Sequence, residues 1–202
     1  MVMKYRLQIS VLGVWSYIFP LKSPDLSEEK KTVGDEGAVA LAKMLEGKKR
    51  LRKLKLNIKR ASDKGVVALA EKLEDSKIRE LSFNFDEVGD EGTSTLAKML
   101  EENSKLTELD LSISKIGDQA VAALAEALAG NLALTKLNLR VNNIDDSGAA
   151  ALAEMLKKNT TLTELKLVMN GVSDEGAKAL AKALEENSTM ETLDLSFDHT
   201  GN

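Results

Sequence analysis

The sequence predicts an α/β solenoid, in which a short unit of strand, turn and helix is repeated along one axis. A Leu-x-Leu pair recurs about every 28 residues between Leu54 and Leu195, and a fixed period of this size indicates a solenoid. The pairs alternate with a turn, an Asp and a segment of small helix-forming residues that ends in Leu. Because so short a unit cannot bury both of its apolar faces alone, neighbouring units must stack on one shared core.

The strands are predicted from the Leu-x-Leu pairs. Period-two alternation of apolar and polar residues is typical of a strand with one buried face. Each pair is preceded three residues earlier by another large apolar residue, as Leu106 precedes Leu109. We therefore expect six regular strands, centred on the pairs Leu54/Leu56, Leu81/Phe83, Leu109/Leu111, Leu137/Leu139, Leu165/Leu167 and Leu193/Leu195.

Each helix is predicted to begin at an Asp. An Asp at the N-cap accepts hydrogen bonds from unpaired N–H groups, and its charge is favourable at the positive end of the helix dipole. Two residues later most copies carry a Gly, and one carries Ala120. Since Gly is unfavourable inside a helix, its presence indicates close backbone packing there. The predicted N-caps are Asp35, Asp63, Asp90, Asp118, Asp146 and Asp174.

The helices are predicted to cover the convex side of the array. Each carries one apolar stripe at i, i+3, i+4 and i+7, with Lys and Glu between, so the stripe faces the sheet and the charges face water. Helices are about 10 Å wide and strands about 4.8 Å apart, so stacking bends the array into a horseshoe arc. The parallel strands then lie on the concave face, which is the natural surface for binding.

Composition excludes several kinds of site. The 202 residues include no Cys, which removes disulfides, thiolate zinc sites and thiol nucleophiles, and favours a reducing, cytoplasmic location. The single His199 lies in the last turn, away from any plausible catalytic partner. Asp145 and Asp146 resemble a calcium pair, but Asp146 is already assigned to a helix start and no calcium-loop spacing follows. We expect no catalytic residue, no cofactor and no metal.

Residues 25–202 are predicted to form one repeat domain, with a degenerate first copy and a truncated last one. The sequence ends in mid-repeat at LDLSFDHTGN without a polar capping helix. An uncovered strand edge invites further pairing, so two interpretations remain open. Either the chain is a fragment of a longer array, such as that of a receptor, or it self-associates through this C-terminal edge.

Residues 1–24 are predicted to be an N-terminal cap or a signal-like segment. Basic residues precede an apolar run from Leu7 to Phe19, as in a secretory signal. However, the segment has no small-x-small cleavage site, and the run is too short to span a bilayer. Tyr5, Leu7 and Ile9 alternate with polar residues, as in a half-buried strand that would cover the first repeat. We prefer the cap.

The outward-facing strand residues are the candidate partner-binding site. Their variation between copies is what a binding face permits. The alternative is lateral compensation, with Lys53 beside Glu80 and Lys136 between two Glu residues, each exposed pair contributing about 0.2–1 kcal/mol. The candidates are Lys53, Lys55, Asn57, Glu80, Ser82, Asn84, Glu108, Asp110, Ser112, Lys136, Asn138, Arg140, Glu164, Lys166, Val168 and Asp194.

Residues 48–60 form the densest basic segment, with no acidic residue among them. This segment could dock an acidic protein surface or phosphates. Alternatively, it is a solvated edge that Glu80, Glu46 and Glu71 partly neutralise. The segment has no interleaved aromatic residues for base stacking, and the whole chain has a net charge of −4, so we do not expect a nucleic-acid partner.

An apolar row lies two residues after the second Leu of each strand. Its members have the same strand parity as the buried Leu pairs, so they are predicted to lie in the core. The alternative is an exposed apolar stripe that awaits a partner. The row consists of Ile58, Phe85, Ile113, Val141, Met169 and Phe197.

The repeat pattern, clearest from Leu134 to Leu156 as LTKLNLRVNNIDDSGAAALAEML, resembles the ribonuclease-inhibitor-like class of leucine-rich repeats. The resemblance covers roughly residues 25–202 and implies the horseshoe fold. In this family an Asn normally binds the turn backbones, so a departure at Lys59 implies looser geometry around it. The corresponding positions are Lys59, Asp86, Ser114, Asn142, Asn170 and Asp198.

The resemblance implies a protein-interaction role, because similar arrays occur in ribonuclease inhibitors, nucleotide-binding immune receptors, Ran GTPase-activating protein and intracellular scaffolds. Our interpretation is a non-enzymatic module that binds a protein on its concave strand face. One alternative is a GTPase-activating or other enzyme-regulating protein, for which Arg140 beside Asn142 and Asn143 is the suggestive cluster. Another is a ligand-sensing fragment of an immune-type receptor.

Overall fold

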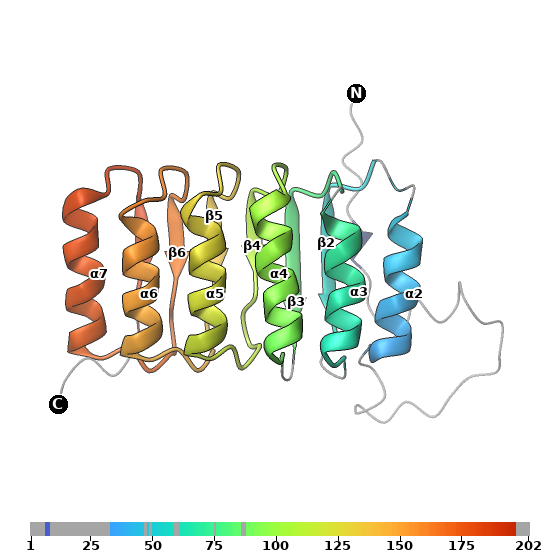
Figure 1. Cartoon of the computed structure of the whole chain (residues 1–202), viewed down its shortest axis with the longest axis horizontal. Coiled ribbons are helices and arrows are strands. Elements are labelled where there is room, and N and C mark those ends of the chain that lie inside the picture. The colour runs from blue at the N-terminus through green and yellow to red at the C-terminus, as the bar shows by residue number, and fades with distance from the viewer. Residues whose placement is uncertain are drawn as a thin grey trace.

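The computed structural model describes residues 7–8, 33–46, 48, 50–58, 61–74, 76–85 and 88–196. Within them, strands and helices alternate along the array (Figure 1). The strands are β1 (Leu7–Gln8), β2 (Lys53–Asn57), β3 (Glu80–Asn84), β4 (Glu108–Asp110), β5 (Lys136–Asn138), β6 (Glu164–Lys166) and β7 (Thr192–Asp194). The helices are α2 (Asp35–Leu45), α3 (Asp63–Leu73), α4 (Asp90–Glu102), α5 (Asp118–Ala129), α6 (Asp146–Leu156) and α7 (Asp174–Glu186).

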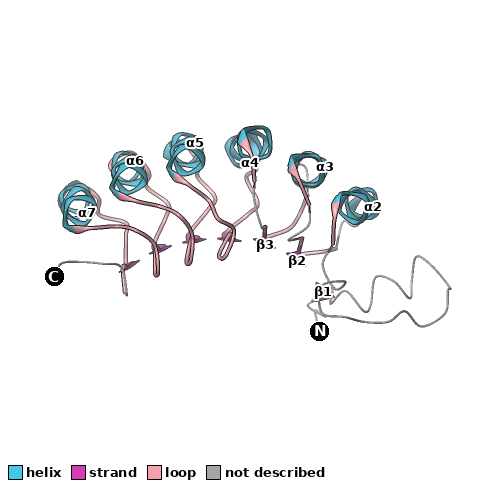
Figure 2. Ribbon diagram, turned by 90° about the horizontal axis from the view of Figure 1, so that it is seen from below, coloured by secondary structure: helices cyan, strands magenta, loops and turns pink. Residues whose placement is uncertain are grey.

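The described strands form one parallel sheet in chain order, from β1 to β7. The Leu residues pair in phase, so that Leu109 lies opposite Leu137 and Leu165 opposite Leu193. Figure 2 shows the helices along the outer side of the arc and the strands along its inner side. The predicted solenoid, with concave parallel strands and convex helices, is confirmed.

The core is one continuous apolar layer between sheet and helices. The inward strand Leu residues, such as Leu109, pack with the helix stripes, and α6 contributes Leu152 and Leu156 from its inner face. In the repeat of β3, Phe83 and Phe85 meet edge to face, with ring centroids 5.5 Å apart. Fully burying a side chain of this kind contributes about 1.5–3 kcal/mol, so the shared layer is the main source of stability.

Strand β1 extends the sheet beside the first regular repeat. Leu7 pairs with Leu54 and Gln8 with Lys55 in parallel register. The rest of residues 1–24 lies outside the described residues, so the choice between a cap and a targeting segment stays a prediction. None of the described helices is both long and apolar enough to cross a membrane.

The helix starts correct the prediction that the repeated Asp is the N-cap. Each Asp is instead the first helical residue, and the N-cap is the residue before it. The Asp carboxylate reaches across to the next repeat. Asp146 Oδ1 accepts from the backbone N–H groups of Ser173 at 2.8 Å and Gly176 at 2.9 Å, and Asp146 Oδ2 accepts from the Ser173 hydroxyl at 2.6 Å. The Asp therefore joins neighbouring helix starts. The N-caps are Gly34, Ser62, Gly89, Gly117, Asp145 and Ser173.

The same Asp bridge recurs along the array and explains the Gly in the first helical turn. Asp35 accepts from Ser62 and Gly65, and Asp118 accepts from Asp145 and Gly148. A Cβ at Gly65 would lie only 2.8 Å from Asp35 Oδ1, so the Gly lets the carboxylate approach. The predicted close packing at these glycines is confirmed.

The copy that carries Ala120 in place of Gly lacks this bridge. Within the part of the chain that the structure describes, no hydrogen bond joins Asp90 to the start of α5. The extra methyl group is thus tolerated where the carboxylate contact is given up.

A row of buried Asn side chains, which the sequence analysis missed, closes the helix C-termini. Asn159 Nδ2 donates to the carbonyl oxygens of Leu128 at 2.6 Å and Asn131 at 3.2 Å, one repeat earlier. Its Oδ1 accepts from the N–H groups of Thr161 and Leu162. The recurrence of Asn at the repeat period was the available signal. The row consists of the buried Asn103, Asn131 and Asn159 and of Asn187, which is partly buried.

Replacement of Asp145 by Ser is expected to raise the melting temperature modestly at neutral pH. Burial raises the pKa of Asp118, and the neighbouring Asp145 carboxyl raises it further. A raised carboxyl pKa means that stability is lost as the pH rises through the folded-state value. In Asp145→Ser the hydroxyl can instead donate to Asp118, as Ser173 does to Asp146, and Ser remains a good N-cap.

The gain should fade as the pH falls below the carboxyl range, because protonated Asp118 no longer repels its neighbour. Thermal melts of both proteins at neutral and acid pH would measure it. A matched Ser173→Asp substitution places a second carboxyl beside Asp146 and should have the opposite effect. If Asp145→Ser lowered the melting temperature at neutral pH, the carboxyl pair would not be the destabilising element.

Candidate functional site

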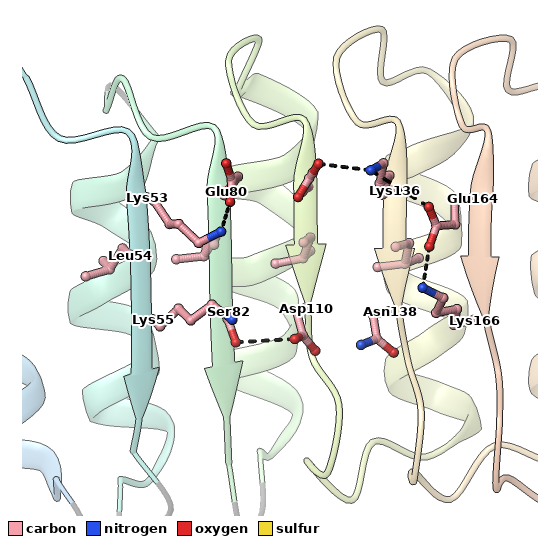
Figure 3. Close-up of a pocket in the computed structure, with 14 residues that line it drawn as sticks. Lys53, Leu54, Lys55, Glu80, Ser82, Asp110, Lys136, Asn138, Glu164 and Lys166 are labelled. Atoms are coloured by element: carbon pink, nitrogen blue, oxygen red, sulfur yellow. Dashed lines mark hydrogen bonds and ion pairs between the residues drawn. The ribbon is translucent and has the colours of Figure 1, made fainter. Parts of the chain in front are cut away.

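A polar hollow crosses the concave face from β2 to β6 (Figure 3). Its floor is made by the Leu residues of the strands, and its polar lining consists of the strand residues on either side of each Leu. In-phase register places equivalent residues of neighbouring strands side by side, as Lys53 beside Glu80. The structure brings together Lys53, Lys55, Glu80, Ser82, Glu108, Asp110, Lys136, Asn138, Glu164 and Lys166 from the predicted site.

Most charges of this hollow compensate one another laterally. Lys53 pairs with Glu80, and Lys136 lies 3.2 Å from Glu108 and 3.9 Å from Glu164. Lys166 reaches the other oxygen of Glu164 at 2.5 Å. The predicted lateral pairs are therefore confirmed.

The ion pairs also keep their lysine and glutamate side chains charged. The hydrogen bond from Lys136 to Glu108 raises the pKa of the lysine, with Glu164 adding to the effect. The hydrogen bond from Lys166 lowers the pKa of Glu164 more than burial raises it. These groups therefore remain charged at neutral pH, as mutual partners.

Lys55 differs from the other cations of the hollow. It is exposed on β2, and it forms no salt bridge with any residue that the structure describes. Its neighbour in register is the uncharged Ser82, whose hydroxyl donates weakly to Asp110 at 3.4 Å. Lys55 and Asp110 are thus the two charged residues of the hollow without a salt-bridge partner among the described residues, and they lie beside a network of paired charges.

The remaining candidates lie toward the carboxyl ends of the strands and outside the hollow. Asn57 and Arg140 are exposed, whereas Asn84, Ser112 and Asp194 are partly buried. Asn84 Nδ2 donates to the Ser112 carbonyl at 2.5 Å, so this side chain is used within the sheet.

The prediction that Val168 is exposed is wrong, since only 5% of its surface is accessible. It belongs to the concave row by sequence position, but a short side chain on the inner side of a curved sheet is covered by its neighbours. Ser82, also short, is 9% exposed for the same reason. Neither residue offers much surface to a partner.

The apolar row is divided between core and surface, which corrects the prediction that all of it is buried. Ile58 and Phe85 are 0% and 1% exposed. Ile113, Val141 and Met169 are 50%, 37% and 51% exposed, and their φ angles are 58°, 54° and 58°. A left-handed residue turns its side chain away from the face that strand parity assigns to it. Phe197 lies outside the described residues.

The polar residue that follows an exposed member explains why that member faces outward. Asn142 turns inward, where its Oδ1 accepts from the N–H groups of Ser114 and Ile116 at 3.0 Å. Its Nδ2 donates to the carbonyl oxygens of Leu111 and Leu139. Because the amide takes the inward place, the preceding apolar residue must face outward. The equivalent positions Lys59, Asp86 and Asp198 lie outside the described residues, so the looser geometry expected around Lys59 stays a prediction.

Of the acidic residues that the sequence suggested as partners of the basic segment 48–60, one pairs with it and another does not. Lys53 pairs with Glu80, as the sequence suggested, but Glu46 pairs with Lys72 of α3 at 2.7 Å and not with the segment. Lys48, Arg50 and Arg52 are exposed. Lys49, Lys59 and Arg60 lie outside the described residues, so docking of an acidic partner on the whole segment stays a prediction.

The described part of the chain can be checked for a metal site and for the cluster proposed for GTPase activation. No group of three or more His, Asp or Glu side chains is placed there to hold a metal ion. In the cluster proposed for GTPase activation, Asn142 is buried and occupied by turn backbones, which leaves Arg140 and Asn143 at the surface. His199 lies outside the described residues.

The comparisons with known proteins point to one family. The family profile described as "TMOD/LMOD Leucine-rich domain" matches residues 70–202. A structure of "Leiomodin-1 Actin-Binding Site 2 (ABS2)" is 21% identical, with a TM-score of 0.50, and the match covers 89% of this chain and 82% of that one. The tropomodulin C-terminal domain of Caenorhabditis elegans is 19% identical, with a TM-score of 0.52, over 80% of this chain and 82% of that one.

No curated protein sequence matches the chain. At these identities the two structures show the fold alone. They support a leucine-rich repeat array, as the sequence predicted, but they do not single out the ribonuclease-inhibitor-like class or the immune receptors.

Proposed function

Because this chain belongs to the TMOD/LMOD leucine-rich domain family, we propose that it is a non-enzymatic module that binds a protein partner on its concave strand face. The observation that carries the proposal is the contrast between Lys55 and its neighbours. The paired charges of the hollow already satisfy one another. Lys55 has a salt-bridge partner neither on β3 nor elsewhere in the described residues.

This contrast determines which partner the face accepts. Covering an ion pair costs less than covering an isolated charge, which must find an opposite charge on the partner. A partner that buries β2 to β6 must therefore place a carboxylate opposite Lys55 and a cation or hydrogen-bond donor opposite Asp110, and meet the paired charges with neutral hydrogen-bonding groups. The exposed Lys48, which precedes β2 in the chain, favours the same acidic approach.

Actin is the first partner to test, because one structure similar to this chain is described as an actin-binding site. We infer a cytoplasmic location from the absence of cysteine. An actin-binding role would also require this location. At the level of the single repeat, we infer a ribonuclease-inhibitor-like unit from the complete helix and the period of about 28 residues.

Lys55→Glu is expected to weaken actin binding at least tenfold, because it places like charges together at the contact. The control is Lys72→Glu, an identical charge reversal on the convex side, where the expected change is within about twofold, as for a charge outside an interface. Fluorescence anisotropy with labelled monomeric actin, and cosedimentation with filaments, would measure both at two salt concentrations.

The two variants separate the parts of the proposal. If wild-type protein bound neither form of actin, actin would be the wrong partner. If actin bound, but Lys55→Glu and Lys72→Glu bound equally, the concave face would not be the contact surface.

A further inference from the structure

We propose that this protein has a second interaction surface, the rim stripe formed by Ile113, Val141 and Met169, which binds an acidic amphipathic helix lying along the solenoid axis. The three side chains occupy equivalent positions in successive repeats. Backbone hydrogen bonds of 2.9 Å join Ile113 to Arg140 and Val141 to Val168, so the members are direct neighbours. The rim stripe lies beyond the carboxyl ends of β4 to β6, apart from Lys55 on β2.

Exposure and backbone strain coincide at the rim stripe. All three members are 37% to 51% exposed and have left-handed φ angles between 54° and 58°. For β-branched residues such as Ile113 and Val141 this region is rarely occupied, and each such residue strains the backbone. Asn or Gly would satisfy the same backbone at lower cost. The apolar side chains are thus only about half buried and add no backbone stability to the fold, which points to a role outside it.

The spacing selects the shape of the partner. Neighbouring strands lie about 4.8 Å apart, so the rim stripe offers one apolar contact at roughly that interval. A helix places residues i, i+3 or i+4, and i+7 on one face at about 5.4 Å per turn. An extended strand repeats its side chains at about 6.6–6.8 Å, which does not fit. A helix that lies across the repeats can therefore place one turn against each member of the rim stripe.

The charges beside the stripe select the sign of the partner. Lys115 and Arg140 are exposed next to it and form no salt bridge with the residues that the structure describes, although Arg140 is near enough to Asp194 to help lower the pKa of that carboxyl. The acidic neighbour Asp145 is occupied at the start of α6, where it accepts from the Ser147 N–H group at 2.7 Å. An apolar strip with basic flanks is complementary to a helix that carries Leu-type residues on one face and Asp or Glu beside them.

The experiment uses a display library of 18-residue peptides selected on the whole chain. The test variant is Ile113→Asn/Val141→Asn/Met169→Asn, because Asn tolerates the left-handed backbone and removes the apolar contact. The control is Leu132→Asn, which removes an apolar side chain that is 80% exposed elsewhere on the surface. Selected peptides should be helical, acidic and apolar at i, i+3 or i+4, and i+7. They should bind the triple variant at least tenfold more weakly and Leu132→Asn unchanged.

The triple variant should also melt at the same or a higher temperature, because strain has been relieved. A lower melting temperature would overturn the strain argument and the proposal with it. Selected peptides that bind the triple variant normally, or that are basic or extended, would overturn it too. If sedimentation showed a wild-type dimer that the triple variant loses, the occupant would be a second copy and the proposal would be overturned. If the rim stripe were required for binding to phosphatidylserine vesicles, the occupant would be a membrane, and the proposal would again be overturned. None of these outcomes depends on actin binding or on Lys55.

Discussion

Replacement of Asn159 by Ala is expected to destabilise the array by about 3–5 kcal/mol, a large share of the stability of an ordinary domain. Asn159 is 3% exposed, and its amide satisfies four backbone groups. Two of them are carbonyls at the end of the preceding repeat, and two are N–H groups of its own loop. Ala would leave these buried groups without partners, each at about 1–3 kcal/mol less what water recovers.

Denaturant unfolding followed by circular dichroism would measure the loss. The matched control is Asn143→Ala, because Asn143 is exposed and its side chain forms no hydrogen bond with the described residues, while its backbone N–H donates to the Ile116 carbonyl in either protein. The control should change the free energy of unfolding by about 0.5 kcal/mol at most. Equal effects of the two substitutions would show that the buried Asn row does not hold the repeats together.

The strand positions and the lateral charge pairs could be predicted from the sequence because each depends on one simple period. Alternation along the strand assigns Leu137 inward and Lys136 outward, and the repeat period then places Lys136 between Glu108 and Glu164. Parallel in-phase register follows once the units are equal in length. These properties need no knowledge of the loops, so the concave hollow was predicted almost completely.

The predictions that the structure contradicts concern side chains that form hydrogen bonds with the neighbouring repeat. Asp146 was predicted as the cap of its own helix, but its carboxylate binds the start of the next one. Ile113 and Ile58 occupy the same repeat position, yet one is exposed and the other buried. Ile113 faces outward because the following Ser114 turns inward, where its hydroxyl accepts from the Phe85 N–H group at 3.2 Å. The residue that follows Ile58 lies outside the described residues. Such contacts involve two repeats at once, and no single period describes them.

These contacts form separate rows along the solenoid. Asp carboxylates join the helix starts, Asn amides join the helix ends, and Asn142 joins the turns that follow the strands. The shared apolar core is not directional, whereas each of these polar rows fixes one repeat against the next. We therefore expect the rows to determine the register and curvature of the concave face, and so the spacing of its ion pairs.

Gly176→Ala is expected to destabilise the array by about 1–3 kcal/mol, as overpacking of a close contact does. A Cβ at this position would lie 2.6 Å from Asp146 Oδ1, 2.9 Å from Val172 Cγ1 and 3.0 Å from Ala149 Cβ. The carboxylate must move away and lose its bond to the Gly176 N–H group, which is the state that the repeat carrying Ala120 already shows. Helix propensity alone predicts the opposite sign, because Ala is favoured over Gly by about 1 kcal/mol.

Gly130→Ala is the matched control, since a Cβ at Gly130 would meet nothing within 4 Å. It should be neutral or should stabilise the protein by about 0.4–1 kcal/mol through the unfolded chain. Denaturation midpoints of the two variants would separate the effects. The Asp146 contact also predicts a pH signature: the hydrogen bonds from Ser173 lower the pKa of Asp146, so its contribution is present above the unfolded-state pKa and is lost as the pH falls through the folded-state value. The difference between wild type and Gly176→Ala should therefore shrink in acid, and a difference that is independent of pH would assign the loss to Val172 and Ala149 instead.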